Sequence, residues 1–312
     1  MMKWLIAVLV SSTIWQSALA SDLLASSPSL SHIVSTGEIT IGHRSSEIPF
    51  SYLVNGQPIG YAIDLCLEVI NALQENLGLN ELNVTFVPLT PANRFILVGN
   101  GTVDIECGVT TNTPERRRQA AFSYPHFLTA TRYVSLAEKQ MNSLQDLAGQ
   151  SVVSTTGTVN IAQLNELNRT QGLNISVMLS RNHEEAFTMV ASGQAAAFVM
   201  DDILLAGLIA SAPNSAAFRI SEATLSNTEP YGLMMPSDDP VFVAQVNKAL
   251  GDIYQSGSIY TLYDKWFVQP IPPDNRVLNL PLAQSLPLYL PILSSTKNEV
   301  DYDAPTYIIP GM

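Results

Sequence analysis

The sequence predicts an α/β fold of two lobes, each a mostly parallel sheet flanked by helices, and three observations support this prediction. Strand and helix patterns alternate between residues 38 and 122. The same alternation returns between residues 151 and 201 without repeating the sequence. Strands that alternate with helices form parallel sheets with crossover helices. Extended stretches after each unit then predict two hinge strands that join the lobes.

The first unit contains clear local signals. Residues 38 to 43 alternate like a strand, and Asn55-Gly56 is typical of a tight turn. Residues 61 to 77 have apolar side chains at helical spacing and are followed by Gly78, a common end of a helix. A strand over residues 82 to 89 and a short helix are expected next.

A strand that runs into a polar turn at residues 104 to 117 is the strongest local signal for a binding site. Thr113, Pro114 and Glu115 are the residue types expected where a helix begins. Arg116 at the mouth of that helix could bind a carboxylate, together with free backbone N–H groups. A capped surface helix with a solvated arginine is the alternative, and it is the better prediction for this stretch taken alone.

The second unit is expected to have the same plan. Its expected elements are strands over residues 131 to 137, 151 to 154, 175 to 179 and 196 to 200, a short helical piece over 143 to 148, and helices over 159 to 168 and from Asn182-His183. A returning strand over 231 to 236 and helices over 240 to 255 and 259 to 266 follow, with Trp266 and Phe267 as core anchors. Prolines crowd the segment from residue 269 onward, which we expect to wrap the surface or to be partly disordered.

Ligands of open α/β sheets bind at the carboxyl ends of the strands. The polar residues at or just after such ends are Arg44, Arg94, Thr111, Arg116, the Thr156-Gly157-Thr158 loop, His183 and Asp201. Their convergence predicts a cleft between the lobes, and it favours a binding role for Arg116. Asp201 and Asp202 are adjacent, so only one of them should face this cleft.

The composition excludes several classes of partner. The 312 residues have a formal net charge of -12, with 15 Lys and Arg against 27 Asp and Glu. An acidic chain with few lysines is not expected to bind nucleic acid or an anionic membrane surface. Any basic site must therefore be local.

The first twenty residues have the pattern of a cleaved secretory signal peptide. Lys3 precedes an apolar run over residues 4 to 10, and Ala18-Leu19-Ala20 is a small-residue cleavage site. The run is far shorter than the ~20 residues that a membrane span needs, which disfavours a retained anchor. No cysteine follows the cleavage site, so a lipid anchor is not expected. We expect a soluble, exported protein that begins near Ser21 with a loose leader to residue 35.

The two cysteines could pair in an oxidising compartment. Cys66 lies in a predicted helix and Cys107 in a predicted strand, and nothing in the sequence fixes their separation. Buried free thiols are common. Free thiols are therefore the prediction.

Short motifs follow one another in a specific order between about residue 37 and about residue 282. They include Gly42-His43-Arg44, Pro49-Phe50-Ser51-Tyr52, Asn93-Arg94, Glu106-Cys107-Gly108, Thr110-Thr111-Asn112, Asp201-Asp202 and Lys265-Trp266-Phe267. With these motifs the chain resembles the glutamate/aspartate-binding periplasmic proteins of amino-acid ABC transporters, solute-binding protein family 3. The resemblance implies the type II periplasmic binding fold and delivery of an acidic amino acid to a membrane ABC permease.

The resemblance also implies a role for each candidate residue. The expected ligand-binding residues are Arg44, Arg94, Thr111, Arg116, Thr156, Thr158, His183 and Asp201. Arg116 and Thr111 would bind the α-carboxylate with the loop of Thr156 and Thr158, and Asp201 would bind the α-ammonium. The remaining three, two arginines and a histidine, would bind the side-chain carboxylate. No catalytic residue, metal or cofactor is expected, and the protein is expected to be a monomer.

Four features bear on the choice of ligand. Pro91 and Val109 stand where the family usually offers serine hydroxyls, and each unpaired polar group of a ligand costs about 1 to 3 kcal/mol. Three arginines against Asp201 leave the predicted pocket near +2, which favours glutamate or aspartate over a neutral ligand. Arg44 could instead form a salt bridge within its lobe. His183 could be a helix cap or a packing residue.

The expected divisions of the chain are a signal peptide over residues 1 to 20, the first part of lobe 1 over 21 to 133, lobe 2 over 134 to 229, a return to lobe 1 over 230 to 270, and a Pro-rich extension over 271 to 312. Two other function classes stay open. One is a dehydratase-like enzyme on the same fold, which needs only a general acid. The other is a sensory amino-acid-binding module.

Overall fold

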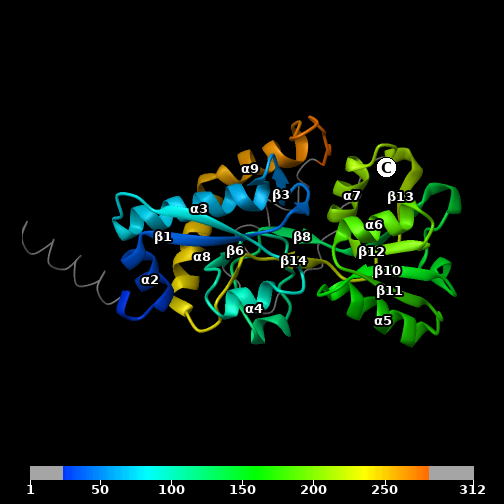
Figure 1. The fold of residues 1–312 in the computed structure, drawn as a ribbon, viewed down its shortest axis with the longest axis horizontal. Coiled ribbons are helices and arrows are strands. Elements are labelled where there is room, and N and C mark those ends of the chain that lie inside the picture. The colour runs from blue at the N-terminus through cyan, green and yellow to red at the C-terminus, as the bar shows by residue number, and fades with distance from the viewer. Residues whose placement is uncertain (1–23, 281–312) are drawn as a thin grey trace, which may run out of the picture.

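The computed structural model describes residues 24 to 280, which form two lobes side by side (Figure 1). The predicted signal peptide and the last residues of the Pro-rich extension lie outside the described residues. No helix among residues 24 to 280 is long and apolar enough to span a membrane.

Lobe 1 is built on a five-stranded sheet in the order β5-β1-β6-β15-β7. Its strands are β1 (Glu38–His43), β5 (Asn83–Pro88), β6 (Ile105–Glu106), β7 (Ala121–Phe122) and β15 (Met234–Met235). Strand β1 is parallel to β5 and β6, and β15 returns antiparallel. The helices of this lobe are α2 (Pro28–Thr36), α3 (Tyr61–Leu77), α4 (Arg94–Gly99), α8 (Pro240–Ser256) and α9 (Ser258–Tyr263), continued by a π-helical turn over Asp264–Val268.

Helix α2 corrects the prediction of a loose leader before residue 35. Ser27 caps the helix by accepting a hydrogen bond from the Leu30 N–H, and Pro28 occupies its first turn. The Ser27 hydroxyl donates to Asp239 at 2.7 Å, and Leu30 and Ile33 are buried. The segment is ordered because its apolar face packs into lobe 1.

Lobe 2 has a second five-stranded sheet in the order β11-β10-β12-β9-β13. Its strands are β9 (Thr131–Leu136), β10 (Ser151–Thr155), β11 (Ser176–Ser180), β12 (Ala197–Asp201) and β13 (Phe218–Ile220). The helices are α5 (Val159–Gln171), α6 (His183–Ala191) and α7 (Asp202–Ser211), with short 3-10 turns over Ala137–Lys139, Leu144–Leu147 and Ser215–Ala217. The three strands β10, β11 and β12 are parallel, and β9 is antiparallel to β12.

Two antiparallel strands connect the lobes. They are β8 (Phe127–Thr129) and β14 (Glu229–Tyr231), which lie between the two sheets in Figure 1. The predicted fold class, two α/β lobes joined by two hinge strands, is confirmed.

A small three-stranded sheet extends from lobe 1 toward lobe 2. It consists of β2 (Ser46–Glu47), β3 (Ser51–Val54) and β4 (Gln57–Ile59). The predicted turn is present between β3 and β4, where Asn55 and Gly56 both have positive φ, at 52° and 77°. This hairpin was not predicted beyond its turn, and it places β2 at the boundary between the lobes.

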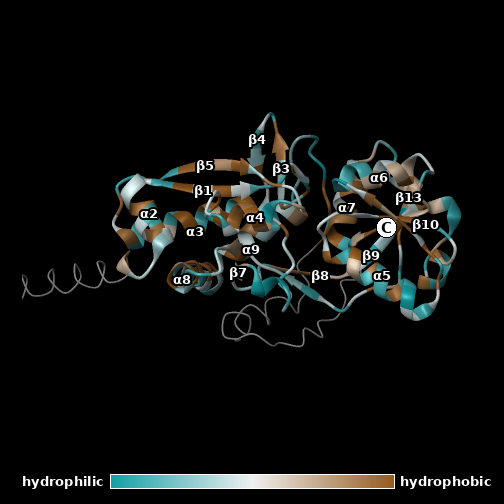
Figure 2. Cartoon of the chain, turned by 60° about the horizontal axis from the view of Figure 1, so that its bottom comes forward, coloured by the Kyte–Doolittle hydropathy of each residue, from teal (hydrophilic) through white to brown (hydrophobic). Residues whose placement is uncertain are grey.

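Aromatic rings join this hairpin to the hinge. The Phe50 ring lies 4.9 Å from that of Phe127 and 5.6 Å from that of Tyr231, measured between centroids. Phe267 stacks on Phe127, and Trp266 donates a hydrogen bond to Asp64. Both anchors of the last helix are buried, as predicted. Figure 2 shows hydrophobic residues along β1 and β5, neighbouring strands of the lobe 1 sheet.

A disulfide between Cys66 and Cys107 corrects the prediction of free thiols. Helix α3 packs on the lobe 1 sheet so that the two Cα atoms are 6.1 Å apart, within the range that a disulfide spans. Both residues are fully buried. The packing distance of the helix on the sheet decides the pairing.

Candidate functional site

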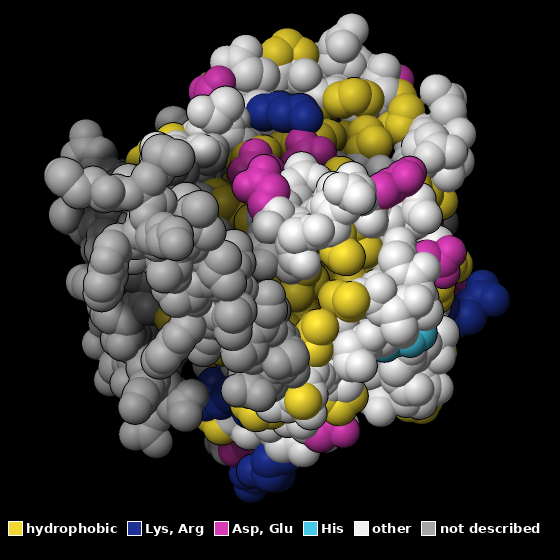
Figure 3. Space-filling model, turned by 90° about the vertical axis from the view of Figure 1, so that its left-hand side faces the viewer, with side chains coloured by type: hydrophobic (Ala, Val, Ile, Leu, Met, Phe, Trp, Pro, Cys, Tyr) yellow, Lys and Arg dark blue, Asp and Glu magenta, His cyan; other side chains and the backbone are white. Residues whose placement is uncertain are grey.

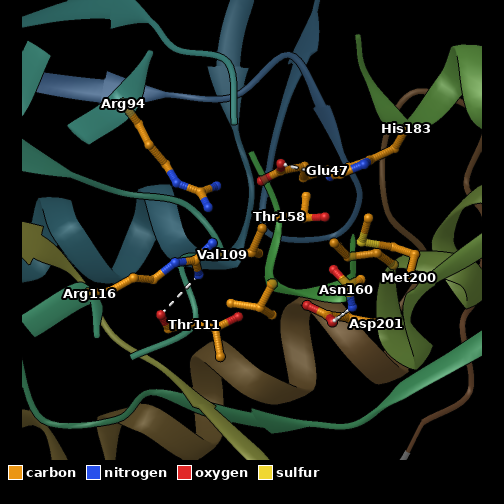
Figure 4. Close-up of a pocket in the computed structure, with 12 residues that line it drawn as sticks. Glu47, Arg94, Val109, Thr111, Arg116, Thr158, Asn160, His183, Met200 and Asp201 are labelled. Carbon is orange, nitrogen blue, oxygen red and sulfur yellow. Dashed lines mark hydrogen bonds and ion pairs between the residues drawn. The ribbon is translucent and has the colours of Figure 1, made fainter. Parts of the chain in front are cut away.

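A narrow pocket, partly open to solvent, lies between the lobes. Lobe 1 lines it with Glu47, Arg94, Val109, Thr111 and Arg116, and lobe 2 with Thr158, Val159, Asn160, His183, Met200, Asp201 and Leu204 (Figure 4). Of the predicted site residues, Arg44 and Thr156 do not line it. The other six predicted site residues all line this pocket.

This pocket gathers basic side chains that are otherwise scattered. Among the described side chains on the face in Figure 3, lysines and arginines lie apart from one another. Arg94 and Arg116 in contrast lie at one wall of the pocket, and both are buried. The prediction that a basic site must be local agrees with this arrangement.

Arg116 is held by backbone carbonyls from both lobes. Its Nη1 donates to the Thr111 carbonyl at 3.0 Å and its Nη2 donates to the Gly157 carbonyl at 3.2 Å. Burial lowers the pKa of Arg116, and the negative charges of Asp201 and Glu106 oppose this effect. Both guanidinium contacts are with neutral carbonyls, which an anion could replace.

The helix predicted after Thr113 is a single 3-10 turn, Arg116–Arg118. The Thr113 hydroxyl does accept a hydrogen bond from the Arg116 N–H, at 3.2 Å. The chain then re-enters the lobe 1 sheet at β7, so an α-helix has no room to continue. The expected hydrogen bond of Thr113 is therefore present, but the helical turn begins at Arg116, after the expected first position Pro114, and ends after 3 residues.

Arg94 lies at the start of α4 and points at the same carbonyl. Its Nη2 donates to Gly157 at 3.2 Å, and its guanidinium carbon lies 5.5 Å from the centre of the Phe95 ring. Burial lowers the pKa of Arg94 to about 9, and the neighbouring charge of Arg116 contributes to this decrease. An anion in the pocket would relieve this repulsion between the two arginines.

Arg44 pairs with a glutamate of its own lobe. Its Nη2 lies 2.6 Å from Oε1 of Glu47, and its Nε donates to the Leu89 carbonyl at 3.0 Å. The alternative of a salt bridge within the lobe therefore describes the structure. Thr156 is exposed, and its backbone N–H donates to the Ser180 carbonyl at 2.9 Å.

Sequence reasoning missed two buried glutamates at this site. Glu47 is 2% exposed and lines the pocket, and Glu106 on β6 is fully buried. Burial raises the pKa of Glu47, but Arg44, His183 and Arg94 outweigh it and lower the pKa below its ordinary value. Burial raises the pKa of Glu106, against the opposing effects of Arg94 and Arg44. A glutamate three residues after Arg44 was the available signal for Glu47.

Glu47 changes the charge of the pocket lining. Among the residues that line the pocket, Arg94 and Arg116 are offset by Glu47 and Asp201, so the formal charge of these four side chains is zero. The predicted pocket charge near +2 is wrong because it included Asp201 alone. The total charge no longer selects an anionic ligand, and local geometry must do so.

Asp201 ends β12 with its carboxylate turned toward the pocket. Oδ1 accepts from the Asn160 amide at 2.7 Å, and Oδ2 accepts from the Tyr231 hydroxyl at 2.5 Å. Asp202 points away and accepts from the Thr129 hydroxyl at 2.7 Å, and burial raises the pKa of Asp202 to about 6. Of the two adjacent aspartates, one lines the pocket, as the alternation predicted.

His183 lies at the start of α6, where Asn182 caps the helix. Its Nδ1 hydrogen-bonds with Oγ1 of Thr155 at 2.9 Å, and its Nε2 lies 3.3 Å from Oε1 of Glu47. Glu47 belongs to lobe 1 and His183 to lobe 2. This contact therefore crosses the cleft (Figure 4).

Gly207 allows the two lobes to approach closely. A Cβ on Gly207 of α7 would lie 2.2 Å from the Ile48 carbonyl oxygen of lobe 1. We expect Gly207→Ala to destabilise the closed arrangement by about 1 to 3 kcal/mol, which raises the ratio of open to closed molecules about 5-fold to 150-fold. Small-angle X-ray scattering should show a larger radius of gyration.

Gly251→Ala is the matched control, since nothing lies within 4 Å of the added methyl group in α8. It should leave the radius of gyration unchanged. An unchanged radius in Gly207→Ala would contradict the close approach of the lobes.

Glu229 on β14 lies near Asp201 and has a strongly shifted pKa. Burial and the charge of Asp201 raise the pKa of Glu229 from 4.5 to about 7, although Gln163 donates a hydrogen bond to it. The folded state therefore holds the proton more tightly than the unfolded state, and the free energy of unfolding falls as pH rises through this window. In Glu229→Gln we expect the decrease in the free energy of unfolding with rising pH to be smaller by about 1 to 3 kcal/mol. Urea unfolding at pH 5 and pH 8 measures it.

The exposed Glu115 supplies the control for this measurement. Glu115→Gln should keep the pH dependence of the native protein. Equal pH dependence in Glu229→Gln and in the native protein would show that the Glu229 carboxyl is not the group responsible.

Comparison with known proteins matches residues 39–269 to the bacterial extracellular solute-binding proteins, family 3. The L-glutamate/L-aspartate-binding protein of Pseudomonas aeruginosa is 42% identical over 82% of this chain and 85% of that protein. The glutamate/aspartate import solute-binding protein of Escherichia coli is 37% identical over 84% of this chain and 87% of that protein.

Solved structures with the same fold include binding proteins for several amino acids. An ancestral arginine-binding protein bound to arginine has a TM-score of 0.67 and 26% identity, over 74% of this chain and 98% of that one. The ancestral amino acid-binding protein described as a precursor of cyclohexadienyl dehydratase has a TM-score of 0.64 and 26% identity, over 76% of this chain and 98% of that one. The resemblance drawn from the sequence motifs is confirmed. The chain belongs to the bacterial extracellular solute-binding proteins of family 3.

Proposed function

We propose that this protein captures an amino acid between its lobes and delivers it to a membrane ABC permease, with glutamate and aspartate as the first ligands to test. One observation carries the proposal. Arg116 of lobe 1 and Asp201 of lobe 2 line the same pocket from opposite sides (Figure 4). A buried cation and a buried anion at such positions complement the carboxylate and the ammonium that every α-amino acid has.

Each charged group is already oriented by neighbours. The Thr111 carbonyl positions the Arg116 guanidinium, and Asn160 and Tyr231 position the Asp201 carboxylate. In this proposal the ligand carboxylate takes the place of the Gly157 carbonyl on Arg116 and accepts from Thr111, and the ammonium donates to Asp201. Thr158 of lobe 2 completes the site.

Binding in this proposal is coupled to closure about the hinge. Strands β8 and β14 are the described connections across which the lobes can rotate. A ligand with contacts on both lobes binds the closed state better than the open state, and only this difference drives closure. The permease would then recognise the closed surface.

The names of the P. aeruginosa and E. coli relatives support acidic ligands and an import role. We further propose that the protein is exported to the periplasm, acts as a monomer without nucleic acid, and is not an enzyme. One observation favours the dehydratase-like alternative: a solved structure with the same fold is described as a precursor of cyclohexadienyl dehydratase. Turnover of prephenate or arogenate by the purified protein would support that alternative and contradict ours.

Isothermal titration with glutamate, aspartate, glutamine, asparagine and arginine tests the proposal. We expect at least one of these amino acids to bind with a dissociation constant on the order of micromolar, about -8 kcal/mol. A panel in which none of them binds would contradict amino-acid capture.

A further inference from the structure

We propose that Glu47 is a built-in carboxylate that occupies the side-chain end of the pocket and lowers the affinity for ligands with an anionic side chain. The inference rests on the proposed amino-acid capture and concerns which side-chain charge the same pocket accepts. It assigns a specificity-determining role to a residue outside the set of ligand-binding residues expected from the sequence.

The Glu47 carboxylate lies between a cation of its own lobe and a histidine of the other lobe. Glu47 Oε1 lies 2.6 Å from Nη2 of Arg44 and 3.3 Å from Nε2 of His183. The side chain is 1% exposed and lines the pocket (Figure 4). These are the contacts that a ligand carboxylate would need, and a carboxylate of the protein already has them.

Two arginines remain available to a ligand in the pocket. Arg44 is occupied by Glu47 and by the Leu89 carbonyl, and it does not line the pocket. The cationic groups that face the space are Arg94 and Arg116, and Arg116 is needed for the α-carboxylate in the proposed pose. A side-chain carboxylate that approaches His183 would therefore come close to Glu47. Two carboxylates at one site repel each other unless one of them takes up a proton.

Glutamate and glutamine differ in the groups that they can offer to Glu47. The side-chain amide of glutamine has the same shape as the glutamate carboxylate but carries two N–H donors. It can donate to Glu47 and accept from Arg94, whereas glutamate offers acceptors alone. Specificity is a difference between two affinities, and a repulsive group directed at one ligand is an effective way to set it.

Glu47 also bridges the lobes through His183, so its replacement can change closure for every ligand. The ratio of two affinities measured in one variant cancels such a common effect. We therefore measure the dissociation constants of glutamate and glutamine by isothermal titration at pH 8, for the native protein, Glu47→Gln and Glu47→Ser. Thermal unfolding identifies which of the two variants is folded.

We expect both variants to shift the ratio of the two affinities at least about tenfold toward glutamate, which corresponds to about 1.4 kcal/mol. Glu184→Gln is the control, because it removes the same charge from an exposed position beside His183 and outside the pocket. It should leave the ratio unchanged. A ratio within threefold of native in a folded Glu47 variant overturns the role of Glu47 and leaves amino-acid capture intact. A native protein that binds neither amino acid contradicts the proposed function itself.

Discussion

Arg116→Ala is expected to weaken the binding of every amino acid by a hundredfold to a thousandfold or more, about 3 to 4 kcal/mol. Arg116 is 8% exposed between the two lobes, and its guanidinium is the proposed partner of the group that all these ligands share. Its loss leaves the ligand carboxylate desolvated without a charged donor. Isothermal titration with the ligand that binds native protein most tightly measures the effect.

Two controls separate this role from a general effect of charge. Arg118 lies two residues further on and is exposed, so Arg118→Ala should bind as native protein does. Arg94→Ala removes a second buried cation of the same wall, and it should change the order of preference among ligands more than the overall affinity. Equal, small losses for Arg94→Ala and Arg116→Ala would refute the different roles proposed for the two residues.

The sequence predicted those parts of the fold that depend on local rules. Helix α3 spans Tyr61–Leu77, the range that its apolar spacing predicted, and Gly78 ends it in the left-handed conformation. Strand β1 covers Glu38–His43, as its alternation predicted. Helix α2 was missed because Ser-rich composition outweighed the Ser27-Pro28 start signal.

Part of the pocket was predicted from a general rule about where ligands bind in α/β sheets. Thr111, Arg116 and Asp201 follow strand ends, and a general rule places such residues in a cleft. Glu47 lies there because a hairpin folds back and the second lobe closes on it, and no local pattern encodes either event. The error in the pocket charge has the same origin, since a buried glutamate cannot be told from a solvated one before its neighbours are known.

The Cys66–Cys107 disulfide was also beyond local reasoning, and its removal should have the largest effect on stability. It closes a loop with a sequence separation of 41 residues. The chain-entropy relation for a loop of this length gives about 4 kcal/mol, because the crosslink restricts the unfolded chain. We expect Cys66→Ala/Cys107→Ala to lower the free energy of unfolding by about 2 to 5 kcal/mol in urea titrations.

Reduction provides the matching control, because reduction and the double substitution both remove the same crosslink. Dithiothreitol should destabilise the native protein to a similar extent and should leave the double variant unchanged. Each sulfur is fully buried beneath α3, so reduction should proceed only through molecules that open transiently. Neither cysteine lines the pocket, so the folded double variant should keep its ligand affinity. A loss of less than about 1 kcal/mol on removing both cysteines would show that the unfolded chain is already confined without the bond.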